Sequence, residues 1–153
     1  MSLKLSFSWI GLVIFALPML INIAFVAFPP AEKAEPTTAA ARWIGIVEQV
    51  SRIAYLLAIT LLVSREPLRF RSAWLWLAAI FLFLYHVVWI RYFAGGRELA
   101  LLNCPFLLVP MPLAVFPELY FLCAALWLHN IPAAIVAVVF GAAHLTVSVQ
   151  SFR

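Results

Sequence analysis

Long apolar stretches separated by short polar ones dominate the pattern along the chain. Residues 9–28, 43–63, 74–94 and 131–149 each form such a stretch. Each is close to the roughly 20 residues that a helix needs to cross the hydrocarbon core of a membrane. The pattern therefore predicts an all-α fold, a polytopic transmembrane helix bundle.

A further apolar stretch, residues 107–128, is interrupted by Pro110, Pro112 and Pro117. Proline removes a backbone donor and kinks or breaks a helix. Non-helical backbone at membrane depth is tolerated only where protein or a cavity covers it. We therefore expect about five spans, with the fourth Pro-kinked or partly re-entrant.

Composition leaves little room for anything outside the membrane. Of the 153 residues, 67% are hydrophobic and 10% are charged, whereas soluble domains are about half apolar and a quarter charged. We expect residues 1–153 to form a single integral membrane domain surrounded by lipids. Whether it forms an oligomer, with copies of itself or with other chains, stays open.

The net charge of +4 does not indicate a nucleic-acid partner, because the cations are scattered singly apart from Arg65, Arg69 and Arg71. That cluster is typical of a cytoplasmic loop under the positive-inside rule. With five spans, this loop predicts a multi-pass protein of the cell membrane whose N-terminus is cytoplasmic and whose C-terminus is outside. The total counts of Lys and Arg on the two sides are equal, so the orientation depends on the compact loop.

Polar residues in the predicted spans fall at similar depths. At about 1.5 Å per residue, one group lies within a slab about 10 Å thick in the outward half of the membrane, namely Asn22, Glu48, Arg52, His86, Glu118 and His144. Charged groups in hydrocarbon are costly and normally face the bundle interior or pair with each other. We therefore predict an outward-facing polar pocket in which Arg52 pairs with Glu48 or Glu118.

Helical spacing indicates which side chains face this pocket. Glu48, Arg52 and Tyr55 share one face of the second span, since they lie at i, i+4 and i+7. His144 follows Gly141 by three residues, at the end of a ridge of small residues that allows close helix approach. Amphipathic aromatic side chains are expected to complete the lining, namely Tyr55, Tyr85, Trp89 and Tyr120.

Glu118 is the strongest single candidate, because it is the only charged residue between Leu99 and Phe152. A carboxyl group at such depth favours its protonated form, which suits proton transfer or acid catalysis. The alternative is a neutral carboxylic acid bonded to a backbone carbonyl. For Glu48 with Arg52 the alternative is a solvated interfacial pair, and for His86 and His144 it is a hydrogen bond between helices.

Two imidazoles and a carboxylate can also hold zinc or iron, so binding of a metal or haem by His86, His144 and Glu118 stays an alternative. No short His spacing supports it, and nucleotide-binding, redox, hydrolase and metalloprotease motifs are absent from the sequence. We therefore predict no cofactor.

Three functions remain open. The leading hypothesis is a small membrane protein that binds, and then moves or senses, an amphipathic or lipid-like molecule through Glu118, Arg52 and His86. The second is a membrane-embedded enzyme acting on a lipid or isoprenoid, with Glu118 as acid or base. The third is a non-catalytic subunit of a membrane complex, whose polar residues only hold helices together.

Overall fold

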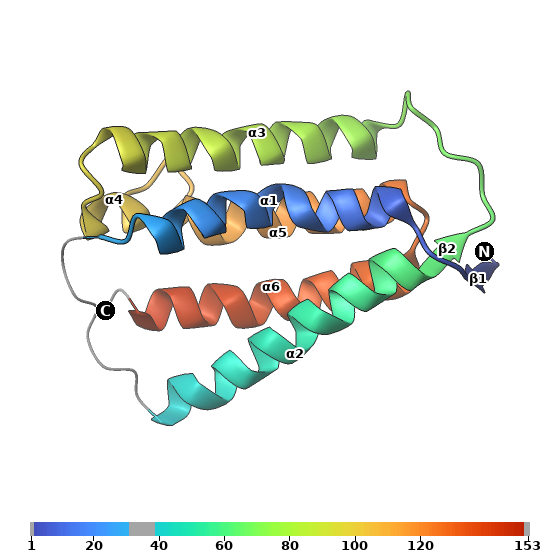
Figure 1. Cartoon of the computed structure of the whole chain (residues 1–153), viewed down its shortest axis with the longest axis horizontal. Helices are drawn as coiled ribbons and strands as arrows, with labels where there is room; N and C mark the ends of the chain where they lie inside the picture. The colour runs from blue at the N-terminus through green and yellow to red at the C-terminus, as the bar shows by residue number, and fades with distance from the viewer. Residues whose placement is uncertain (1, 31–38, 152–153) are drawn as a thin grey trace.

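Four long apolar helices dominate the structure, a computed structural model that describes residues 2–30 and 39–151 (Figure 1). Each is long and apolar enough to cross a membrane, and they comprise α1 (Trp9–Ala27), α2 (Ala39–Leu61), α3 (Ala73–Ala94) and α6 (Ile131–Ser151). The outward side chains fit that environment, because Ile23, Phe83 and Ile135 are 65%, 67% and 62% exposed. This confirms an all-helical bundle with four helices suited to the membrane.

The fourth predicted span has a shorter helix than expected. Helix α5 (Pro112–Trp127) has 16 residues and follows the short helix α4 (Leu99–Asn103). Between them Phe106 and Val109 exchange backbone hydrogen bonds across a tight turn. Residues 107–111, predicted as the start of the span, are therefore not helical. A five-span arrangement and a kinked fourth span are not established by these helices.

A small two-stranded sheet lies at one end of the bundle and was not predicted. Strand β1 (Leu3–Leu5) pairs antiparallel with β2 (Leu62–Ser64), with Lys4 opposite Val63. The prediction that the second span continues to residue 63 is wrong at its end, because Leu62 and Val63 belong to the strand. In Figure 1 this sheet and the end of α6 lie at opposite ends of the bundle.

Polar side chains fix where several helices begin. The Ser8 hydroxyl accepts a hydrogen bond from the backbone N–H of Gly11, and the Ser72 hydroxyl accepts one from that of Trp74. Asn130 does the same for Ala133 at the start of α6. Such caps satisfy donors that have no partner inside the helix, and here they set the ends of α1, α3 and α6.

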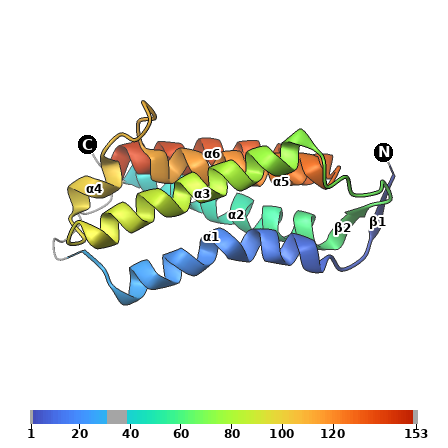
Figure 2. The ribbon, with the colours of Figure 1, turned by 90° about the horizontal axis from the view of Figure 1, so that it is seen from above.

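Packing is tightest among four of the helices. Helix α2 packs mainly on α6, α3 on α5, and α5 on α6, whereas α1 packs less extensively on α2, α3 and α5. Figure 2 shows α3, α5 and α6 together on one side of the bundle and α1 on the other. Buried Ala133 and Ala137, with Gly141 one turn further on, form the predicted small-residue ridge of α6. Small side chains let neighbouring backbones approach closely.

Candidate functional site

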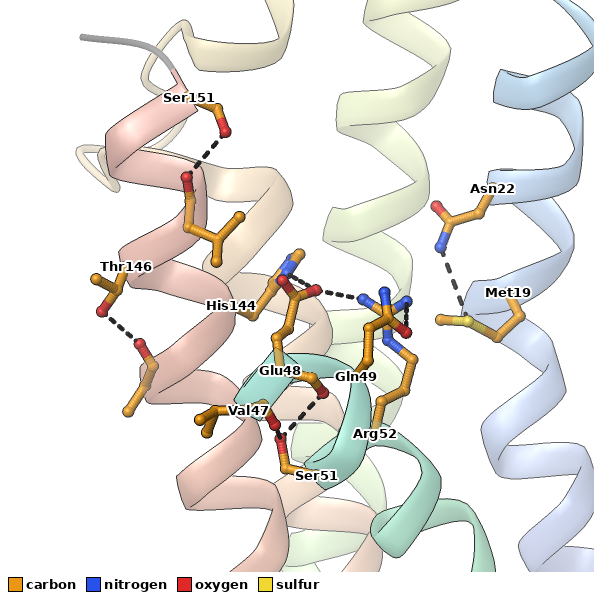
Figure 3. Close-up of polar contacts among 12 residues, drawn as sticks. Met19, Asn22, Val47, Glu48, Gln49, Ser51, Arg52, His144, Thr146 and Ser151 are labelled. Atoms are coloured by element: carbon orange, nitrogen blue, oxygen red, sulfur yellow. Dashed lines mark hydrogen bonds and ion pairs between the residues drawn. The ribbon is translucent and has the colours of Figure 1, made fainter. Parts of the chain in front are cut away.

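Glu48 and Arg52 of α2 and His144 of α6 form a polar network between the two helices (Figure 3). The Arg52 guanidinium and Oε1 of Glu48 form an ion pair within one turn of α2. The same oxygen lies 3.0 Å from Nδ1 of His144. Since Glu48 is only 6% exposed, these two groups are its main polar contacts. Of the two acceptors predicted for Arg52, the structure selects Glu48.

An aromatic ring of α6 supports the network. The guanidinium carbon of Arg52 lies 5.3 Å from the centre of the Phe140 ring, within the range of a cation–π interaction. Phe140 is buried, and its ring centre lies 5.8 Å from that of His144. Arg52 is therefore positioned by a carboxylate on its own helix and by a ring on the next.

A cavity of about 160 Å³ lies next to this network, between α1, α3, α5 and α6. Its polar lining comprises Asn22, Tyr85, Trp89, His144 and Ser148. His144 belongs to both network and cavity, and Figure 3 shows Asn22 on α1, across from the network. The Tyr85 hydroxyl donates to Oδ1 of Asn22 at 3.0 Å. The structure thus brings predicted residues from three spans to the wall of one cavity.

Glu118 of α5 packs against α6. A Cβ atom added at Gly141 would lie 3.2 Å from Oε2 of Glu118. Gly141 is one helical turn before His144, and Ala114, which lines the cavity, is one turn before Glu118. The carboxyl group therefore lies behind the cavity wall, near the network, and neither Glu118 nor Arg52 is among the residues that line the cavity.

Several buried polar atoms around the cavity have no hydrogen-bond partner among the described residues. Among them are both carboxyl oxygens of Glu118, Nε of Arg52 and Nε1 of Trp89. A buried polar group left unpaired costs about 1–3 kcal/mol, and buried polar groups are normally bonded to protein or water. Trp89 thus has a free donor in a residue of the cavity wall. Glu118 and Arg52 have an unpaired carboxyl group and a second unpaired donor close to that wall.

The hydroxyl groups of two other predicted residues are used elsewhere. Tyr55, fully buried, donates to the carbonyl oxygen of Phe121 at 2.8 Å. Tyr120 donates to the carbonyl oxygen of Ile14 at 2.9 Å. Neither lines the cavity, so their hydroxyl groups join α2 to α5 and α5 to α1.

His86 is not among the residues that line the cavity. Its Nδ1 lies 2.8 Å from the carbonyl oxygen of Leu82, one turn earlier on the same helix. A ligand role for His86 stays a prediction. Within residues 2–30 and 39–151, no three His, Cys, Asp or Glu side chains are grouped so that they could hold a metal ion. His86, His144 and Glu118 therefore do not form such a group.

Ser148 and Asn130 are among the polar residues that sequence reasoning missed. Ser148 lies one turn after His144 on the same face of α6, which helical spacing could have revealed. Asn130 is 1% exposed, and its amide donates to the carbonyl oxygens of Ala58 at 2.8 Å and Leu62 at 2.7 Å. Its place just before Ile131 and Pro132 is a helix-start signal, but the contacts to α2 and β2 leave no trace in the sequence.

No family model, curated protein or solved structure matches the chain. The fold defines the class, a helical bundle with four helices able to span a membrane. Because a fold hosts many functions, function has to be argued from the site.

Proposed function

We propose that this chain is a membrane protein that binds an amphipathic or lipid-like ligand, with the polar end of the ligand in the cavity between α1, α3, α5 and α6. Arg52, Glu118 and His144 are the proposed polar contacts, supported by Asn22 and Trp89. The ligand is either moved across the membrane or sensed there.

The observation that carries this proposal is the buried Glu118 carboxyl group, whose two oxygens have no partner among the described residues. A structural carboxylic acid would be expected to bond to a nearby carbonyl or hydroxyl group. The unpartnered N–H groups of Arg52 and Trp89 supply donors close by. A ligand head carrying both donor and acceptor atoms complements this set.

Cavity size supports an amphipathic ligand over a wholly polar or bulky one. Sites for drug-sized molecules are usually about 300–1,000 Å³, whereas this cavity is about 160 Å³. It would accept a head group, and an apolar remainder would lie between helices. Leu102, Leu113 and Met111 in the cavity wall offer apolar contacts at that boundary.

We also propose five membrane crossings, with the N-terminus cytoplasmic and the C-terminus outside. Helix α5 spans about 24 Å at 1.5 Å per residue, less than the roughly 30 Å hydrocarbon core, so α4 and the turn before Pro112 would complete the fourth crossing. An odd number of crossings is supported by the positions of β1 and the end of α6 at opposite ends of the bundle (Figure 1). The basic β1–β2 end would face the cytoplasm.

Thermal unfolding of the purified full chain in detergent, with and without total membrane lipid extract, tests the ligand site. We expect the extract to raise the melting temperature of the wild-type protein. Glu118→Gln, which keeps the shape of the side chain, and Ala114→Leu, which fills the cavity, should each remove that rise. Glu98→Gln and Ala100→Leu, at exposed positions shortly after the end of α3, are the matched controls and should keep it.

Two outcomes would overturn the proposal. If the extract stabilises Glu118→Gln and Ala114→Leu as much as wild type, the cavity is not the site. If it stabilises none of the proteins, while the variants remain fully active in cells, the polar residues only hold helices together, as in a non-catalytic subunit. Turnover of an extract component that stops in Glu118→Gln, although stabilisation persists, would instead identify an enzyme.

A further inference from the structure

A second cavity lies at the end of the bundle nearest the sheet, between α1, α3 and α5. It is an apolar groove of about 420 Å³, within the usual range for ligand sites. Its lining includes Trp9, Val13, Leu17, Leu75, Leu82 and Trp127. Helix α1 has few contacts with its neighbours, which leaves this seam open along the side of the bundle. We call it the α1–α3 groove.

A basic loop contacts the α1–α3 groove at Trp127. Nε1 of Trp127, a groove residue, donates to the carbonyl oxygen of Arg69 at 3.0 Å. The ring of Phe70 lies 6.0 Å from that of Trp127. Arg69 and Arg71 flank Phe70 in sequence, and both are exposed. The backbone of this basic loop is therefore held beside Trp127, at one end of the groove.

More positive charge lies at the same end of the molecule. Exposed Lys4 sits on β1, and the backbone N–H of exposed Arg65 donates to the carbonyl oxygen of Ser2. Glu66 is the one acidic side chain among residues 2–30 and 62–72, against the four cations named. An apolar groove that opens at a basic rim is complementary to a molecule with an acyl chain and an anionic head.

We propose that the α1–α3 groove binds an anionic phospholipid, with an acyl chain along α1 and α3 and the phosphate head at Arg69, Arg71 and Lys4. Basic residues next to a membrane each contribute about 1 kcal/mol to the attraction of anionic lipids. Tryptophan at the rim suits this depth, because its ring is amphipathic and favours the level of the head groups. The site is separate from the polar cavity, so it goes beyond the ligand site proposed above.

Native mass spectrometry of the full chain in detergent tests this site with two probes, dioleoyl phosphatidylglycerol and dioleoyl phosphatidylcholine. We expect the first bound phosphatidylglycerol to be held about tenfold more tightly than the first phosphatidylcholine. The double variant Arg69→Gln with Arg71→Gln should abolish that preference. It leaves the backbone carbonyl that accepts from Trp127 in place. The matched control, Arg42→Gln with Arg97→Gln, removes two exposed cations outside the β1–β2 end and should keep the preference.

A second pair of variants tests the groove itself. Ala79→Phe places a ring in the groove, where it would displace the acyl chain. Because the chain then loses its apolar contacts there, binding of the first phosphatidylglycerol should weaken about tenfold or more. Ala142→Phe, on an exposed face of α6, should not. Unaltered melting temperatures would show that both proteins are folded.

Three results would overturn the proposal. The first is equal affinity for the two lipids, which would indicate a general acyl-chain surface. The second is an equal loss of preference in the Arg42 and Arg97 control, which would indicate non-specific charge attraction. The third is a dimer that Ala79→Phe dissociates, which would mean that a second copy of the chain covers the groove.

Discussion

Nδ1 of His144 lies 3.0 Å from Oε1 of Glu48, so a polar contact joins the last helix to the second across 96 residues of sequence. The same oxygen is paired with Arg52. One carboxylate therefore holds two basic side chains, and removing it affects the contact between α2 and α6 as well as the pair within α2.

Glu48→Leu is expected to lower the free energy of unfolding by about 1–3 kcal/mol, because Arg52 and His144 lose their acceptor while remaining partly buried. The loss should be smaller than for a fully buried pair, since the Arg52 side chain is 27% exposed. Titration of mixed micelles with sodium dodecyl sulfate measures it. Glu66→Leu, in an exposed loop, is the control and should change stability by less than about 0.5 kcal/mol. Equal effects of the two substitutions would show that the network does not stabilise the bundle.

Gly11→Ala is expected to destabilise the contact between α1 and α2. An added Cβ would lie 2.0 Å from the carbonyl oxygen of Ile59, so the helices must separate at a cost of about 1–3 kcal/mol or more. The free energy of unfolding of the full chain measures this.

Gly45→Ala provides the opposite result in the same assay. Among the residues that the structure describes, no atom outside the local helix lies within 4 Å of a Cβ built at Gly45. Alanine in a helix interior is favoured over glycine by about 0.5–1 kcal/mol. The variant should therefore be more stable than wild type. If Gly11→Ala is also more stable than wild type, α1 and α2 do not approach each other as closely at Gly11 as the structure shows.

Asn130→Asp is expected to destabilise the start of α6 although it changes only one amide group. Two carbonyl oxygens that accept from the Asn130 amide would face a carboxyl oxygen instead, and each unpaired buried group costs about 1–3 kcal/mol. Thermal unfolding in detergent measures the loss. Asn103→Asp, at the half-buried end of α4, is the matched control and should have little effect. A normal melting temperature for Asn130→Asp would contradict the buried contacts to α2.

Gly141→Leu is expected to destabilise the chain because its side chain must displace that of Glu118. The cost should be partly relieved when Glu118 is shortened to alanine. A double-mutant cycle with Glu118→Ala should therefore give a coupling energy of about 0.5–3 kcal/mol. Ala142→Leu, on the exposed face of α6, should show no such coupling. Additive effects of Gly141→Leu and Glu118→Ala would mean that the two residues do not touch.

The sequence predicted the helices better than their ends. Apolar run length depends on local composition, so α1, α3 and α6 begin and end close to the predicted residues. By contrast, Leu62 and Val63 read as apolar helix but pair with β1, a contact to residues far earlier in the chain. Helix α5 begins at Pro112 and not at the predicted residue 107, because Met111 has a left-handed backbone conformation. A hydrophobic pattern does not reveal such a conformation.

The candidate site divides in the same way. Helical spacing predicted that Glu48 and Arg52 share a face, and they pair. Depth alone placed His86 with His144, but helix rotation decides which side chains meet, and the Nδ1 of His86 bonds to its own helix. Tyr55 was expected at the cavity from helical spacing and, like Tyr120, from its amphipathic ring, whereas packing gives both hydroxyl groups carbonyl partners on neighbouring helices. Rotation and tilt come from all helices together and leave no local signal.

The strand pair has a consequence for the order of events during synthesis. Every backbone partner of the N-terminal strand lies within residues 2–65, where Ser2, Ser6 and Ser8 bond to Arg65, Leu61 and Thr60. The first two long helices can therefore form the backbone hydrogen bonds between residues 2–8 and 60–65 before the later helices have left the ribosome. The nascent chain would then offer α3, α5 and α6 a preassembled surface on which to dock.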